Sequence, residues 1–151
     1  MKMKGIYYKD GCWYFDEYFA YLNEHLTDIP IKIRDFITDF ERYSLSHGNT
    51  LHDSILLDIE YILTETSNRL IVKLKGPYFD RIFNFQFEGI TKIWFSHPDR
   101  CLKNSELITF QFELLRRCRY RIDFIFDCGV KMRVDFEKLE ISETKLNVPD
   151  R

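Results

Sequence analysis

The residues best suited to metal binding or catalysis are His52 and Asp53, which lie at the start of the first segment with strand periodicity. An adjacent histidine and aspartate can ligate a divalent metal, and a metal-dependent hydrolase using His52 and Asp53 is one alternative that the sequence leaves open. His47 lies across a predicted turn and could approach His52, and the only other histidines are His25 and His97. We expect His52 and Asp53 to hydrogen-bond the backbone where helix passes into strand, and we predict no metal and no cofactor.

Other catalytic signatures are missing from the sequence. There is no G-x-S-x-G motif, no phosphate-binding glycine loop and no dinucleotide fingerprint, and the 6 glycines are scattered singly. Asp58 and Glu60 share one face of a predicted strand, where paired acids are typical of a solvated surface. We therefore predict no catalytic residue and a protein that is not an enzyme.

A basic stretch covers Arg116–Arg121 and includes Arg117 and Arg119. Arginines interleaved with aromatics can contact phosphates, so nucleic-acid binding through Arg116–Arg121 is a second alternative. A β-hairpin turning near Asp127-Cys128-Gly129 accounts for the same charges differently. Pairing the apolar faces sets opposite charges across from each other on the polar face: Asp123 with Arg133, Arg121 with Asp135, and Arg119 with Glu137. We favour this structural role.

Hydrophobic periodicity divides one predicted domain, residues 1–151, into three parts. A stripe at helical spacing predicts a helical hairpin over about 12–47. Asp28 is expected to cap its second helix, Pro30 to lie in that helix's first turn, and Gly48 to end the hairpin in a left-handed conformation. Alternating apolar residues predict strands over about 51–141, with a bulge or tight turn at Gly89, and the polar tail 142–151 is expected to fray.

Short turns between these strands demand antiparallel pairing, because a parallel return needs a long crossover. The predicted fold class is therefore α+β, with the N-terminal helical hairpin packed on the apolar face of a six- or seven-stranded antiparallel sheet.

Composition limits the function classes. The formal net charge of -2 argues against a dedicated nucleic-acid binder, and no apolar stretch is long enough for a membrane helix. The N-terminal segment lacks the apolar run of a signal peptide. We therefore expect a cytoplasmic protein whose 4 cysteines are free thiols, most of them buried.

Aromatic residues make up 17% of the chain and are dense near the N-terminus, where tyrosine recurs at positions 7, 8, 14, 18 and 21. Trp13 and Trp94 are candidate interface anchors, and each could equally fill a corner of the core. Aromatic richness with balanced charge favours a non-enzymatic protein that binds another protein and no membrane, and it disfavours nucleic acid as the partner. The sequence leaves homo-oligomer formation open.

The order of motifs also resembles a group of known sequences. Leu51-His52-Asp53-Ser54, then two alternating strands, Phe87-Glu88-Gly89-Ile90 and the final hairpin resemble small uncharacterised bacterial families with a Leu/Phe-His-Asp-Ser/Ala strand opener. Some of these families are grouped with immunity proteins of bacterial toxin systems. The resemblance covers about residues 45–141. It implies a small antiparallel-sheet protein, plausible as an immunity-type protein of a bacterium, and it carries over no active site.

Overall fold

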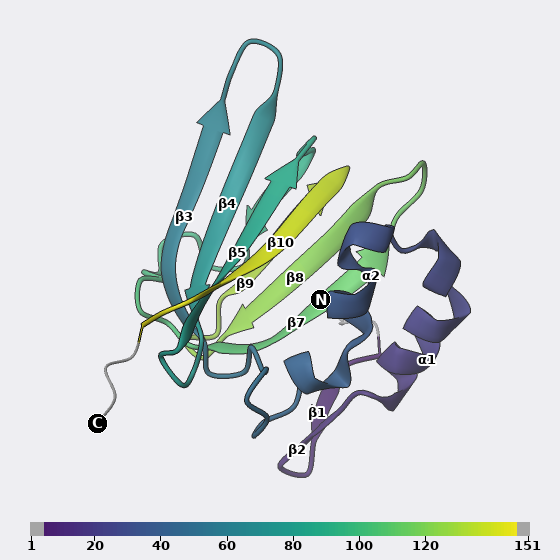
Figure 1. Ribbon diagram of the computed structural model, residues 1–151, viewed down its shortest axis with the longest axis vertical. Coiled ribbons are helices and arrows are strands. Elements are labelled where there is room, and N and C mark those ends of the chain that lie inside the picture. The colour runs from purple at the N-terminus through teal and green to yellow at the C-terminus, as the bar shows by residue number, and fades with distance from the viewer. Residues whose placement is uncertain (1–4, 148–151) are drawn as a thin grey trace.

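The computed structural model describes residues 5–147, which form an α+β fold (Figure 1). The helices of the described chain are α1 (Asp16–Glu24) and α2 (Ile31–Thr38), with 3₁₀ turns at Leu26–Asp28 and Phe40–Arg42. The strands are β1 (Tyr7–Lys9), β2 (Cys12–Tyr14), β3 (Ile55–Leu63), β4 (Asn68–Lys75), β5 (Arg81–Glu88), β6 (Lys92–Phe95), β7 (Leu107–Leu114), β8 (Tyr120–Phe126), β9 (Lys131–Phe136) and β10 (Lys138–Lys145).

The strands are all antiparallel, as predicted, but they form two larger sheets rather than one. The first sheet has the strand order β10-β5-β4-β3 and the second has the order β6-β9-β8-β7, while β1 and β2 pair as a separate hairpin. Alternation predicted the strands correctly because each has one apolar face. It did not reveal that the two apolar faces cover each other.

Phenylalanine rings fill the space between the two sheets. Phe85 of the first sheet meets Phe124 of the second edge-on, with ring centroids 5.4 Å apart, and Phe87 meets Phe136 at 4.9 Å. Phe36 of α2 contacts Phe85 and also Phe110 of β7, so this helix packs against both sheets. The helices therefore lie at one side of the sandwich, as Figure 1 shows, whereas we expected them to cover the apolar face of a single sheet.

The chain passes between the sheets at a corner made by Gly89 and Glu137. The ladder that pairs Glu88 with Lys138 in the first sheet resumes with Lys92 and Asp135 in the second, so residues 89–91 oppose residues 136–137. An extra residue on one strand bends the ladder, which is how strands change sheets in such folds. Gly89 adopts a φ of 65°, and a Cβ there would lie 2.8 Å from Cβ of Glu137. The predicted bulge or turn at Gly89 is confirmed.

The register of the β8–β9 hairpin is also confirmed. Arg121 pairs with Asp135 and Asp123 with Arg133, and both arginines make bidentate contacts of 2.6–2.9 Å. The hydrogen bond to Asp135 raises the pKa of Arg121. Arg119 precedes β8 and is exposed, so its predicted pairing with Glu137 is not part of the ladder.

Several predicted boundaries in the helical part were wrong. The segment Cys12–Tyr14 is strand β2, and α2 ends at Thr38, well before position 47. Asp28 lies in a 3₁₀ turn and does not cap α2, whose N-cap residue is Pro30, without a side-chain hydrogen bond. Gly48 does not have a left-handed φ. Local turns built around Tyr43 end the helical segment instead.

Two predictions about the sheet part also need correction. Residues 142–145 do not fray, because they complete β10 and pair with β5; the last four positions of the tail lie outside the described residues. In β3, the predicted alternation is interrupted at its start, because a bulge between Leu56 and Asp58 turns Leu56 inward and leaves Leu57 exposed.

Replacing Gly89 with alanine should destabilise the fold by about 2 kcal/mol or more, because a left-handed φ and a close neighbouring side chain both penalise a Cβ. The matched control is Gly48→Ala, since a Cβ at Gly48 would meet no heavy atom within 4 Å. Urea unfolding followed by circular dichroism measures both. Equal midpoints for the two variants would contradict the proposed corner.

Candidate functional site

His52 and Asp53 lie where the chain joins the two sheets. Asp53 N–H donates to the Leu107 carbonyl and Leu107 N–H donates to the Ser54 carbonyl, both at 2.8 Å, so this segment pairs with the start of β7. The His52 Nδ1 lies 2.7 Å from the Ile108 carbonyl oxygen. Because a carbonyl only accepts, Nδ1 must carry the proton. The predicted backbone hydrogen bond of His52 is confirmed.

The second ring nitrogen of His52 faces the Asp53 carboxylate, with Nε2 and Oδ1 3.2 Å apart. His47 has different partners: its Nε2 lies 3.1 Å from Glu41 Oε1, and its Nδ1 accepts from Asn49 N–H. His47 and His52, which could have approached each other across the turn, therefore contact different residues. Within residues 5–147, no group of three or more His, Cys, Asp or Glu side chains could hold a metal ion.

The remaining candidates from the sequence are dispersed over the molecule. Arg116, Arg117 and Arg119 are exposed in the turn between β7 and β8, where Arg117 has a φ of 61°. Trp94 lies on β6 across from Arg133, on the outer face of the second sheet, and is partly exposed. Trp13 lies on β2 and packs partly against the core.

The cysteines are free, as predicted, but they are not mostly buried. Cys12, Cys101 and Cys118 are exposed and Cys128 is half-buried. Neither α1 nor α2, the two α-helices of the described chain, has the length and apolarity needed to cross a membrane.

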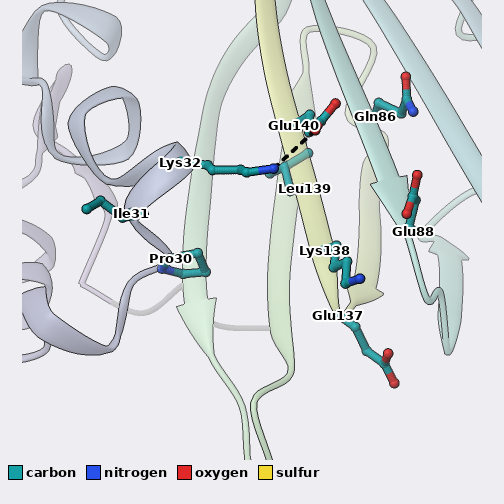
Figure 2. Close-up of a pocket in the computed structure, with 9 residues that line it drawn as sticks. All are labelled: Pro30, Ile31, Lys32, Gln86, Glu88, Glu137, Lys138, Leu139 and Glu140. Atoms are coloured by element: carbon teal, nitrogen blue, oxygen red, sulfur yellow. Dashed lines mark hydrogen bonds and ion pairs between the residues drawn. The ribbon is translucent and has the colours of Figure 1, made fainter.

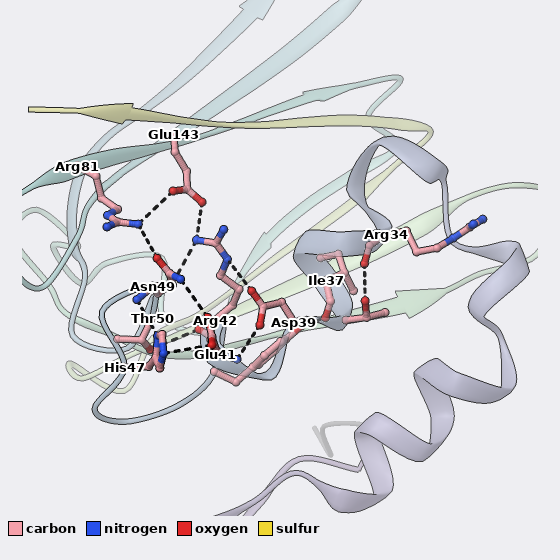
Figure 3. Close-up of polar contacts among 12 residues, drawn as sticks. Arg34, Ile37, Asp39, Glu41, Arg42, His47, Asn49, Thr50, Arg81 and Glu143 are labelled. Carbon is pink, nitrogen blue, oxygen red and sulfur yellow. Dashed lines mark hydrogen bonds and ion pairs between the residues drawn. The ribbon is translucent and has the colours of Figure 1, made fainter.

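A polar network joins the loop after α2 to the end of the first sheet (Figure 3). Glu143 of β10 contacts the guanidinium groups of both Arg42 and Arg81. Arg81 also donates to the side chain of Asn49 at 3.0 Å, and the Arg42 guanidinium lies over the ring of Phe36, 4.5 Å from its centroid. Both arginine side chains are largely buried, so these contacts hold the last strand to the helical part.

A shallow pocket of about 310 Å³ lies between the start of α2 and strands β5 and β10 (Figure 2). Its only ion pair among the residues drawn joins Lys32 to Glu140 at 3.4 Å, and both side chains are exposed. Two lysines and three glutamates are mixed along its lining, so no single sign of charge converges on the pocket.

Tyrosine hydroxyl groups cover part of the edge of β7, the last strand of the second sheet. The Tyr18 hydroxyl accepts from Phe112 N–H and the Tyr21 hydroxyl accepts from Leu114 N–H, each at 2.9 Å. The Tyr43 hydroxyl donates to the Ile37 carbonyl at 2.7 Å, so Tyr18 must donate in the 3.0 Å contact between the two hydroxyls. Burial raises the pKa of Tyr18 and of Tyr43.

The tyrosines of the N-terminal hairpin behave differently, because they remain exposed. Tyr7 stacks on Tyr14 with ring centroids 5.1 Å apart, and Tyr8 contacts Trp13 at 5.3 Å. Tyr8 is 60% exposed, and Tyr7 and Tyr14 are each exposed by roughly two fifths. The hairpin therefore presents tyrosine rings to solvent on both of its faces, although Trp13 beside Tyr8 also packs against the core.

No family model matches the chain, and no curated protein matches it either. The resemblance to families with a Leu-His-Asp-Ser opener accordingly stays a prediction.

Tyr18→Phe should destabilise the protein by about 1–3 kcal/mol, because it leaves the buried Phe112 N–H without an acceptor. Tyr8→Phe, which changes only an exposed hydroxyl, should have almost no effect.

Raised phenol pKa values favour the folded state below the unfolded value of about 10, and that stability is lost as the pH rises further. Urea titrations at pH 7 and above pH 10 test both points. Equal stability of the two variants would contradict the structural role of the Tyr18 hydroxyl.

Glu143→Ala should cost about 2–4 kcal/mol, because two largely buried arginines lose their shared carboxylate. Glu140→Ala, on the same strand, removes only an exposed pair and should cost less than about 1 kcal/mol. Thermal unfolding measures both variants. Hydrogen exchange in β10 should also accelerate in Glu143→Ala only; similar exchange in the two variants would show that the network does not hold this strand.

Proposed function

We propose that this protein is a non-enzymatic protein-binding module, and that its N-terminal aromatic hairpin β1–β2 makes the contact. The exposed tyrosines Tyr7, Tyr8 and Tyr14 are the observation that carries the proposal; Tyr7 stacks on Tyr14, and Tyr8 contacts the half-buried Trp13. Tyrosine and tryptophan are the side chains that contribute most often to the binding energy of protein interfaces, because they bury a large area with few rotatable bonds.

The hairpin suits this role for a second reason. An isolated two-stranded ribbon is marginally stable in water, so its aromatic pairs must hold it together as well as face solvent. A partner that covers these rings would bury them and stabilise the ribbon at the same time. Phe40 adds a further exposed ring. It contacts Phe15, which directly follows the hairpin in the chain, and Phe19 of α1.

An immunity-type protein, which neutralises a bacterial toxin by binding it, is one form of this proposal. It is motivated by the sequence resemblance of residues 45–141. In that case the partner would be a toxin protein, and binding rather than chemistry would be the whole activity of this chain.

The test uses the immobilised full chain to retain a protein from a bacterial lysate, followed by titration calorimetry with that protein after purification. Tyr8→Ser and Tyr14→Ser should each weaken binding at least about tenfold, as truncation of a central aromatic does. Tyr78→Ser is the matched control, because Tyr78 is an exposed tyrosine on the β4–β5 turn.

Two outcomes would contradict the proposal. The chain could retain no protein at micromolar concentration, or the hairpin variants could bind as tightly as Tyr78→Ser does.

A further inference from the structure

Strand β3 forms one outer edge of the first sheet. Its start bonds to residues 104–106, and Figure 1 shows no helix or strand beyond the rest of it. After the bulge near Leu57, β3 pairs regularly with β4 from Asp58 to Leu63. This edge is far longer than that of β6, which spans Lys92–Phe95 in the second sheet.

The register shows which backbone groups of β3 point outward. Thr64 N–H donates to the Ser67 carbonyl at the end of the same ladder, at 2.9 Å. Hydrogen-bonded positions alternate in an antiparallel pair, so the even positions of the segment bond to β4. The N–H and C=O groups of Ile59, Tyr61 and Leu63 consequently face away from β4. Within residues 5–147, no hydrogen bond to another segment uses them.

The side chains along this edge form two rows of opposite character. Ile59, Tyr61 and Leu63 share the face that continues the sheet's apolar side; Tyr61 is 49% exposed and Leu63 is 72% exposed. Asp58 and Glu60 share the other face with Ile62, and both acids are exposed; Asp58 lies across from Lys73 of β4. A strand added to this edge would thus meet an apolar row on one face and two carboxylates on the other.

The other long edges have neighbours in the fold. His52, Tyr18 and Tyr21 bond to the backbone of β7. Helix α2 lies beside β10, where Lys32 reaches Glu140. Proteins normally block an exposed edge strand that has an apolar row, because such an edge pairs readily with another strand. The exposed edge of β3 is therefore a candidate site for strand addition.

We propose that the free edge of β3 accepts an extended segment of a protein partner in which lysine or arginine alternates with apolar residues. Backbone hydrogen bonds at Ile59, Tyr61 and Leu63 would supply the attachment, and the two side-chain rows would supply the selectivity. A second copy of this chain fits less well, because β3 itself carries no lysine or arginine to pair with Asp58 and Glu60. This surface is separate from the aromatic hairpin, so the proposal does not depend on the function proposed above.

The probe is an acetylated eight-residue peptide alternating lysine and valine, and its control alternates glutamate and valine. Nuclear magnetic resonance of the isotope-labelled full chain follows binding and amide hydrogen exchange. We expect the lysine peptide at saturation to slow exchange at Ile59, Tyr61 and Leu63 at least tenfold, while the amides of Asp58 and Glu60, already bonded to β4, change little. Protection absent from these three amides would overturn the proposal.

Two variants separate strand addition from other binding. Tyr61→Pro removes an outward N–H that the ladder with β4 does not use, so the sheet should persist while peptide affinity falls at least tenfold. Glu60→Lys keeps every backbone group, and it should weaken binding of the lysine peptide and strengthen binding of the glutamate peptide. If Tyr61→Pro impairs folding, the change in peptide preference of Glu60→Lys tests the proposal alone.

Sedimentation of the chain without peptide tests the competing occupant. We expect a species whose mass does not depend on Tyr61→Pro. A dimer that Tyr61→Pro dissociates would overturn the proposal in favour of a second copy of this chain. Unchanged peptide preference in Glu60→Lys would also overturn it, because the acidic row would then have no part in recognition.

Discussion

Backbone groups at the edge of a β-sheet need partners, and the division of this chain into two sheets creates an edge at each side of each sheet. The packed phenylalanines can stay between the sheets only if both sheets keep their strands paired up to those edges. At β7 this requirement is met by side chains from distant segments: His52, Tyr18 and Tyr21 each reach its backbone. The helical part is therefore attached to the sandwich by hydrogen bonds to strand backbone as well as by apolar contact.

The sequence was informative wherever one pairing rule determined the answer. In the β8–β9 hairpin, the apolar faces and the opposite charges of Asp123 and Arg133 select the same register, and the structure has that register. Gly89 was identifiable as a bend because a lone glycine inside a strand pattern often marks a bulge or a tight bend of the backbone. The change of sheet at that bend was not identifiable, because alternation has the same period in one sheet as in two. Alternation also did not reveal the bulge near Leu57, which exchanges the faces of Leu56 and Leu57 at the start of β3.

The contacts that hold the parts together were missed because each joins residues far apart in the chain. Glu143 reaches Arg42 and Arg81, so the last part of β10, which we predicted to belong to a fraying tail, is held by two guanidinium groups. One signal for the tyrosine contacts was available, since Tyr18 and Tyr43 occupy positions in an apolar stripe where phenylalanine would suffice. A buried phenol needs a hydrogen-bond partner, and its presence in such a stripe points to a backbone group nearby. The partner itself, Phe112 N–H on an edge strand, follows only from the three-dimensional arrangement.

Tyrosine thus has two roles in this chain, and the position of the hydroxyl distinguishes them. Where the hydroxyl bonds to the backbone, as at Tyr18, the ring belongs to the structure and is unavailable to a partner. Where ring and hydroxyl both face solvent, as at Tyr8, the fold gains little from a phenol, and a partner surface is the environment that would use it. The same reasoning applies to the sheet edges. The edge of β7 bonds to side chains of its own chain, whereas the outward backbone groups of Ile59, Tyr61 and Leu63 in β3 make no hydrogen bond to another segment within residues 5–147. The fold supplies internal hydrogen-bond partners to some tyrosines and some sheet edges and leaves others without them. We therefore expect binding on the surfaces that lack internal partners.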